Sequence, residues 1–259
     1  MVPSTLFSFQ RRNQRSMTSL ITKYCFCLML LSLFFSAAAQ NAKQDILKIN
    51  ETYTSLEDLS MDITYTLFPS AKSKVPEETH AGCFKQHGIM KYSKVKDIEA
   101  VHNKNYSLVI DNDDKLIVVA NPARFSASKI TMLDLEKSLS LCSSVEFIGT
   151  TGNQSGYKLV FKQNAPSEYD AVELYFNKKT FLVEKLVMYY RQTIKLNEED
   201  PNSVKDKPRL EIAFLNASLK KITDISFFLE EKFIEKKKGK YYTASAYNSY
   251  QLIDQKFAK

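Results

Sequence analysis

The sequence predicts a mainly β protein with a few helices, of the α+β class, in which about ten antiparallel strands form one curled, unclosed barrel. Three observations predict this fold. Short runs of alternating apolar and polar residues follow one another along most of the chain, beginning at residues 61–67. Clusters of turn-forming residues separate several of these runs, as at residues 111–114. Apolar residues at three- and four-residue spacing precede the first run, which is typical of an amphipathic helix.

That helix is expected over residues 43–59, where Ile46, Ile49 and Tyr53 recur on one side and charged residues fill the other. The 259-residue chain is 44% hydrophobic and 12% aromatic, which gives it enough apolar surface for a substantial core. Its 6 glycines and 7 prolines exclude collagen-like and low-complexity chains.

The period then changes to two, and a series of short strands is predicted. We expect strands over residues 61–67, 79–85, 89–95, 98–102, 106–111, 116–120, 145–150, 157–162, 171–177, 182–191 and 209–219. The turn cluster at 111–114 makes a hairpin of the two strands that flank it, and a tight turn at 177–180 makes a second hairpin.

Other segments are expected to interrupt or follow the strands. Residues 130–139 are compatible with a short inserted helix, and residues 197–208 with an exposed loop. Residues 227–233 are compatible with one or two helical turns, and residues 241–253 with a last strand. The sheet, the N-terminal helix and the insert would together bury one face of the sheet.

One face of almost every predicted strand is strongly apolar, whereas the other carries residues such as Asp62, Lys158 and Glu173. Such a face can be a packed core or the lining of an apolar cavity, and the sequence leaves both alternatives open. The candidate lining residues are Met61, Ile63, Tyr65, Leu67, Met90, Tyr92, Leu108, Ile110, Tyr157, Leu159, Phe161, Val172, Leu174, Phe176, Leu210, Ile212 and Phe214. The candidate lid residues, on the inserted helix, are Met132, Leu133 and Leu135.

The N-terminus is typical of a secretory signal peptide. Basic residues lead into an apolar run at residues 24–35, and Ser36-Ala-Ala-Ala39 offers small residues for cleavage. We therefore expect residues 1–39 to be removed, from a start at Met1 or Met17, and residues 40–259 to form a single domain. An uncleaved interfacial anchor is the alternative. Cleavage lowers the net charge from +7 to +3, because Arg11, Arg12, Arg15 and Lys23 leave with the signal.

Two cysteines, Cys83 and Cys142, remain in the mature chain. An exported protein can hold a disulfide, so the two could pair, but each is equally plausible as a small buried hydrophobic residue.

Motifs of catalysis or metal binding are weak. No phosphate-binding glycine loop occurs, and no metal site or cofactor is predicted. The spacing His80-x-x-Cys83-x-x-x-His87 would suit zinc, but on a strand His80 and Cys83 point to opposite faces. Residues 111–114 resemble the start of a calcium loop without its glycine and closing glutamate, so a hairpin turn is favoured.

The densest positive cluster comprises Lys236, Lys237, Lys238 and Lys240, next to Tyr241 and Tyr242. It could be a solvated hairpin tip, a contact with anionic lipid or a protein partner, or a nucleic-acid contact. The solvated tip is favoured, transient membrane contact stays possible, and no nucleic-acid partner is expected for an exported protein.

The order of elements resembles the LolA/LolB-like family of periplasmic carriers that bring lipoproteins to the outer membrane. The resemblance lies in the signal peptide, the amphipathic helix and four later runs, at residues 59–67, 106–122, 156–161 and 172–186. It implies an unclosed, strongly curled barrel with helices inside its open mouth as a lid. The family's cavity arginine is assigned to no position of this chain, and residues beyond 219 fit the pattern poorly.

The resemblance also implies a role. It suggests an exported carrier, in the periplasm of a Gram-negative bacterium, that binds acyl chains of lipoproteins or other lipids in an apolar cavity. Membrane-bound donor and acceptor proteins would be its partners, it would act as a monomer, and it would not be an enzyme. The alternatives are a cell-envelope binding or assembly module with a packed core and no lipid, and an exported enzyme whose site leaves no local motif.

Overall fold

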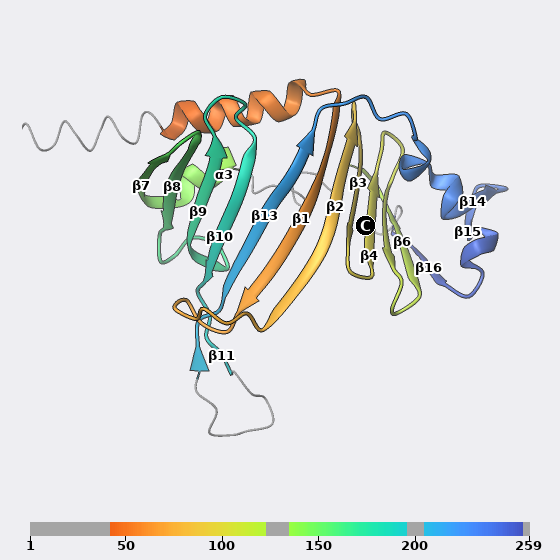
Figure 1. The fold of residues 1–259 in the computed structure, drawn as a ribbon. Coiled ribbons are helices and arrows are strands. Elements are labelled where there is room, and N and C mark those ends of the chain that lie inside the picture. The colour runs from red at the N-terminus through yellow and green to blue at the C-terminus, as the bar shows by residue number, and fades with distance from the viewer. Residues whose placement is uncertain (1–41, 123–134, 196–204, 256–259) are drawn as a thin grey trace, which may run out of the picture.

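The computed structural model describes residues 42–122, 135–195 and 205–255. The signal-peptide prediction for residues 1–39 lies outside these ranges. Within them, one helix near the N-terminus and one large curved sheet make up most of the fold (Figure 1). No helix in the described ranges is both long and apolar enough to cross a membrane.

The N-terminal helix spans residues 42–55 and ends four residues earlier than the sequence pattern predicts. Its last turn is closed by the Leu56 amide, which donates to the Thr52 carbonyl at 3.1 Å. Leu59, expected on the helix, is instead a strand residue opposite Gln86. Backbone pairing of the following strand with its neighbour begins at Asp58, and this long-range ladder overrides the helical spacing.

Twelve strands form the sheet, in the order β16-β6-β5-β4-β3-β2-β1-β13-β10-β9-β8-β7. Their bounds are β1 (Asp58–Phe68), β2 (Glu78–His87), β3 (Met90–Val95), β4 (Ile98–His102), β5 (Ser107–Asp111), β6 (Leu116–Ala120), β7 (Cys142–Thr151), β8 (Gln154–Phe161), β9 (Tyr169–Asn177), β10 (Val183–Tyr190), β13 (Arg209–Ser218) and β16 (Gln251–Asp254). The edge strands β7 and β16 do not pair with each other, so the sheet is unclosed. This confirms the predicted fold class.

Shorter elements complete the described chain. They are the helix α3 (Leu135–Leu141), the 3₁₀ turns η1 (Ser226–Phe228), η2 (Glu230–Lys232) and η3 (Ser245–Tyr247), and the two-stranded pairs β11 (Ile194–Lys195) with β12 (Lys205–Asp206) and β14 (Ile234–Lys237) with β15 (Lys240–Thr243).

Both predicted hairpin turns are confirmed. The Asp111 carboxylate accepts the amides of Asp113 and Asp114 at 3.0 Å, and β5 pairs with β6 around it. Asn177 closes the β9–β10 turn in the same way, because its side-chain oxygen accepts the Lys179 amide at 3.0 Å. Short polar side chains that bond to the next amides fix such turns locally, which is why sequence alone locates them.

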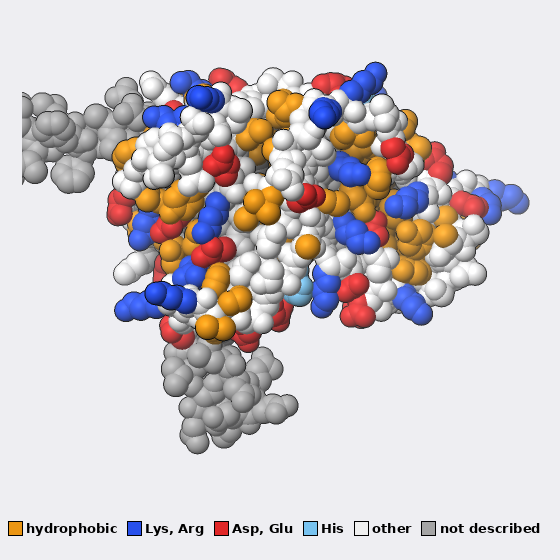
Figure 2. All heavy atoms as spheres, viewed as in Figure 1, with side chains coloured by type: hydrophobic (Ala, Val, Ile, Leu, Met, Phe, Trp, Pro, Cys, Tyr) orange, Lys and Arg blue, Asp and Glu red, His pale blue; other side chains and the backbone are white. Residues whose placement is uncertain are grey.

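The sheet is covered on different faces at its two ends. We call the side that carries Met61 and Ile63 of β1 the helix-side face, because residues of the N-terminal helix share one buried cluster with side chains of β1, β13, β10, β9 and β8 on that side. Over β3–β6 the C-terminal segment, residues 219–250, packs instead on the opposite face. Figure 2 shows one side of the molecule, on which basic and acidic side chains are interspersed with apolar ones.

The C-terminal segment differs from its prediction in one respect. Residues 241–253 were expected to form one last strand of an antiparallel sheet, but they divide into β15, η3 and β16. Moreover, β16 runs parallel to β6, with Leu252 opposite Ile117. The parallel direction results from the path of the chain, which crosses the opposite face before it reaches the edge of β6.

Cys83 and Cys142 are both free thiols. Five strands separate β2 from β7 in the sheet, a distance of about 29 Å at 4.8 Å a strand. Cys83 packs against the cluster on the opposite face and Cys142 against the cluster on the helix-side face. The two thiols are therefore unpaired and half-buried, and partial burial raises the pKa of Cys142 to about 11.

Candidate functional site

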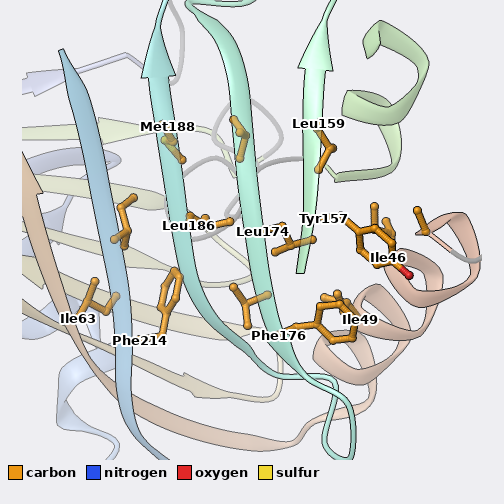
Figure 3. Packing of buried hydrophobic residues seen from close by; sticks show 14 of the residues in the cluster. Ile46, Ile49, Ile63, Tyr157, Leu159, Leu174, Phe176, Leu186, Met188 and Phe214 are labelled. Atoms are coloured by element: carbon orange, nitrogen blue, oxygen red, sulfur yellow. The ribbon is translucent and has the colours of Figure 1, made fainter. Parts of the chain in front are cut away.

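Most of the candidate lining residues come together on the helix-side face. Figure 3 shows apolar side chains such as Phe214, Leu186 and Leu174 on one face of the sheet, with Ile46 and Ile49 of the N-terminal helix beside Tyr157 and Phe176. The members of this cluster predicted from sequence are Met61, Ile63, Tyr65, Tyr157, Leu159, Phe161, Val172, Leu174, Phe176, Leu210, Ile212 and Phe214. Leu67 lies opposite Leu210 at the end of the same face and is half-buried.

The N-terminal helix seals this part of the face. Ala42, Ile46 and Ile49 are 0% exposed, as are Leu159 and Leu174 beneath them. The Tyr157 hydroxyl donates to Asp45 on the helix at 2.8 Å, and burial raises its pKa. Where the helix meets β8 and β10, therefore, the helix-side face is a packed core.

A second polar contact fixes the other end of the helix. The Val183 amide donates to the Tyr53 hydroxyl at 3.2 Å, and burial raises the pKa of Tyr53 to about 12. The Gln86 amide nitrogen donates to the carbonyls of Tyr53 and Leu56 at 3.3 and 2.8 Å. These bonds satisfy backbone groups that the end of a helix leaves without partners.

Four candidate lining residues, Met90, Tyr92, Leu108 and Ile110, lie on the opposite face. Phe84 belongs to the helix-side cluster and is paired with Ser93, so Tyr92, one residue away, points to the other side. The expectation that they share one lining with Met61 is therefore wrong. Alternation shows which residues of one strand share a face, but the register between strands decides which face that is.

These four residues instead form the floor under the C-terminal segment. Phe228, Phe233 and Ile234 are at most 1% exposed and pack against Leu108, Ile110 and the rest of that cluster. Lys85 lies 3.3 Å from the centre of the Phe227 ring, a cation–π contact that binds the segment to β2.

A buried carboxylate, Glu99, joins these strands to the segment. It accepts the Tyr92 hydroxyl at 2.8 Å and lies 3.3 Å from the Lys94 ammonium and 3.9 Å from that of Lys232 on η2. Burial alone would raise its pKa, but the Tyr92 bond and the two lysine charges hold the pKa of Glu99 below its ordinary value.

The lid prediction is only partly within the described ranges. Met132 and Leu133 lie outside them, and Leu135 is the first residue of α3. Leu139 and Leu141 of that helix pack against the helix-side cluster, next to β7. A helix at the position predicted for residues 130–139 is thus present from residue 135 onward.

Sequence reasoning missed the part of the helix-side face that lies over β3–β6. Paired positions across these strands place Ser93, Ala100, Val109 and Val118 in one row. None of the four belongs to either apolar cluster of the described chain. One sequence feature could have revealed this part of the face. Residues 116–120, Leu-Ile-Val-Val-Ala, are apolar at every position, which indicates a strand that is covered on both faces.

The lysine cluster forms a hairpin tip. Lys238 and Gly239 have φ angles of 50° and 81° and make the turn between β14 and β15. Lys236 lies 5.6 Å from the centre of the Tyr241 ring, and Lys237 pairs with Glu235. The favoured interpretation of these lysines as an exposed tip agrees with this geometry, and membrane contact stays a prediction.

The zinc spacing does not assemble. His80 pairs with Tyr65 on the helix-side face, while His87 lies on the opposite face and bonds Asp58 at 2.8 Å. Within the described ranges, no group of three His, Cys, Asp or Glu residues could hold a metal ion.

No family model and no curated protein matches the sequence. Solved structures similar to the chain include an uncharacterized conserved protein from Thermus thermophilus, at 9% identity and a TM-score of 0.45, covering 81% of this chain and 98% of that one. A putative outer membrane lipoprotein-sorting protein domain from Vibrio parahaemolyticus has 8% identity and a TM-score of 0.38, covering 73% and 97%. A LolA superfamily protein from Nitrosomonas europaea has 8% identity and a TM-score of 0.31, covering 70% and 96%.

Proposed function

We propose that this protein is an exported, non-enzymatic carrier that binds acyl chains of lipoproteins or other lipids and moves them across the periplasm of a Gram-negative bacterium to the outer membrane. Residues 40–259 act as one domain and as a monomer in this proposal. Membrane-bound donor and acceptor proteins load and unload it, and Lys236, Lys237, Lys238 and Lys240 touch the membrane transiently.

One observation supports the proposal: the sheet never closes, and on its helix-side face Ala100, Val109 and Val118 form an apolar row over β4–β6 that lies outside the helix-side cluster. A domain that needed only a core could bury this face once, under the helix. Here a row of small and apolar residues over β4–β6 belongs to neither apolar cluster of the described residues. Each buried methylene of a lipid is worth about 0.8 kcal/mol, so a single acyl chain on this surface gives ample affinity.

The packed contacts of Ile46 and Ile49 favour the second candidate, a cell-envelope module with a filled core and no lipid. One experiment distinguishes the lipid carrier from the module with a filled core. The full chain is expressed with its own N-terminus, purified without detergent, and extracted for lipid mass spectrometry. A carrier releases lipid in a stoichiometric amount and binds a dansyl-labelled fatty acid. A module with a packed core does neither, and that result contradicts the proposal.

The expected place of action is tested separately. Cell fractionation should find the protein in the periplasm with residues 1–39 removed, and N-terminal sequencing should begin at Gln40. Full-length protein in the cytoplasm would contradict export. Strong binding to vesicles of anionic lipid that disappears at high salt would support contact through the four lysines.

A further inference from the structure

A pocket of about 600 Å³ lies where the C-terminal segment meets the loop between β4 and β5. Two of its lining residues, Tyr106 and Ile234, are 2% and 1% exposed and belong to the apolar cluster on the opposite face of the sheet. Tyr241 of β15 also lines it, and β14 and β15 lie at the far end of the sheet from β7 (Figure 1). A pocket of this size has room for a small organic molecule.

Backbone hydrogen bonds fix both sides of this pocket. In the loop after β4, the side-chain oxygen of Asn103 accepts the amides of Asn105 and Tyr106 at 2.8 and 3.2 Å. On the other side, the amide of Phe233, a residue that is 0% exposed, donates to the Glu230 carbonyl at 2.7 Å and closes η2. A ligand would therefore meet walls that are already in place, which lowers the entropic cost of binding.

Carboxylates outnumber ammonium groups around the pocket. Glu230, Glu231 and Glu235 line it together with one lysine, Lys236. The Glu235 carboxylate is also paired with Lys237 on the hairpin, so we assign the attraction mainly to the two glutamates of η2. Carboxylates favour a cation and accept hydrogen bonds from an ammonium group.

The aromatic wall of the pocket points to the same charge. The Lys236 ammonium lies 5.6 Å from the centre of the Tyr241 ring, within the range of a cation–π contact. The two residues pair directly across β14 and β15, which holds the side chains side by side. The protein thus already places one ammonium group on this ring, and a ligand ammonium can take the same position.

We propose that this pocket binds a small organic cation, a primary ammonium group on a short aromatic or apolar body. The body packs on Tyr106 and Ile234. The ammonium donates to the carboxylates of Glu230 and Glu231 and replaces Lys236 on the neighbouring ring. The pocket is separate from the helix-side face, so this binding does not depend on lipid.

Titrations of the full-length protein followed by saturation-transfer NMR test the charge preference. The probes are phenethylamine, 2-phenylethanol and phenylacetate, which share an aromatic body and differ in the charge of the end group. Phenethylamine should bind about tenfold more tightly than 2-phenylethanol, and phenylacetate should bind most weakly. Equal binding of the amine and the alcohol, or binding of none of the three, overturns the inference.

Variants test the location. The double substitution Glu230→Gln and Glu231→Gln keeps the shape of both side chains and should weaken phenethylamine by about fivefold or more, while 2-phenylethanol is unaffected. Lys236→Met removes the competing ammonium and should strengthen phenethylamine by about threefold. Glu77→Gln is the matched control, since Glu77 is exposed in the loop between β1 and β2, and should change nothing.

Circular dichroism and thermal unfolding confirm that each variant folds, and the single substitutions replace the double one if it does not. Unchanged phenethylamine binding in the glutamine variants overturns the assignment to this pocket. Weaker binding of phenethylamine in Lys236→Met would also overturn it, because the lysine would then assist the ligand instead of competing with it.

Discussion

Arg191 holds the loop that joins β8 to β9. Its guanidinium donates to the Asp170 carboxylate at 3.1 Å and to the backbone carbonyls of Lys162, Gln163, Ala165 and Tyr169. Arg191→Ala leaves these acceptors without their donor and should lower the free energy of unfolding by about 2 kcal/mol or more. Urea denaturation of the wild-type protein and the variant measures this loss of unfolding free energy.

A matched control uses the same carboxylate. Lys207 also pairs with Asp170, but both side chains are more than 40% exposed. Lys207→Ala should therefore change stability by at most about 0.5 kcal/mol. Equal losses in the two variants would show that the carbonyl bonds of Arg191 contribute nothing.

Gly82 marks a close approach of β2 and β3. A Cβ at this position would lie 2.5 Å from the Lys94 carbonyl oxygen, a backbone atom that can move only with its strand. Gly82→Ala should destabilise the protein by about 1–3 kcal/mol. At Gly156 the nearest atoms, at 2.9 Å, belong to the Tyr175 ring, which can rotate. Gly156→Ala should therefore lower the stability less than Gly82→Ala does. A lower melting temperature for Gly156→Ala than for Gly82→Ala would contradict this explanation.

The elements were largely predictable because their signals are local. The strands at 98–102 and 116–120 were predicted to the residue, since each is a short strand-like run and the second is apolar throughout. The faces were not predictable in the same way. Tyr92 and Phe84 are both apolar residues on neighbouring strands, and their sequence does not show which face of the sheet each occupies. Because Phe84 pairs with Ser93, the adjacent Tyr92 lies on the opposite face of the sheet.

The N-terminal helix is held by the apolar side chains that its spacing predicted. Ile49 is 0% exposed, and Ile49→Ala should lower the free energy of unfolding by about 2–5 kcal/mol, because a cavity opens between helix and sheet. Glu51 is exposed, and Glu51→Ala should be nearly neutral. A small loss at Ile49 would mean that the helix is not packed on the sheet in solution.

The C-terminal segment depends on the charge of Glu99. Because the folded-state pKa of Glu99 is lowered, its ionised form stabilises the fold above the unfolded pKa, about 4.3, and this contribution is lost as the pH falls through the folded pKa. Glu99→Gln should lower stability at pH 7 and reduce the difference in unfolding free energy between pH 6 and pH 3. An unchanged pH dependence would show that the carboxylate is not ionised beside Lys94.

At the scale of the whole molecule, the sheet has a firm centre and weaker edges. The strand β1 is paired along its length with β2 on one side and β13 on the other, whereas β7 has a partner on one side only and β16 contributes four residues. Local opening is least costly where the fewest contacts break. Native-state hydrogen exchange followed by NMR should find the slowest amides in β1 and β13, and much faster ones in β7 and β16.

Hydrogen exchange can also locate a bound acyl chain. If an acyl chain occupies the helix-side face over β3–β6, adding palmitate should slow exchange in β3, β4 and β5 more than in β8 and β9, which the N-terminal helix already covers. Protection that appears instead in β8 and β9 would place the ligand under the helix and require the packed core to open. Equal exchange in β1 and β7 before any ligand is added would mean that the sheet opens as one unit.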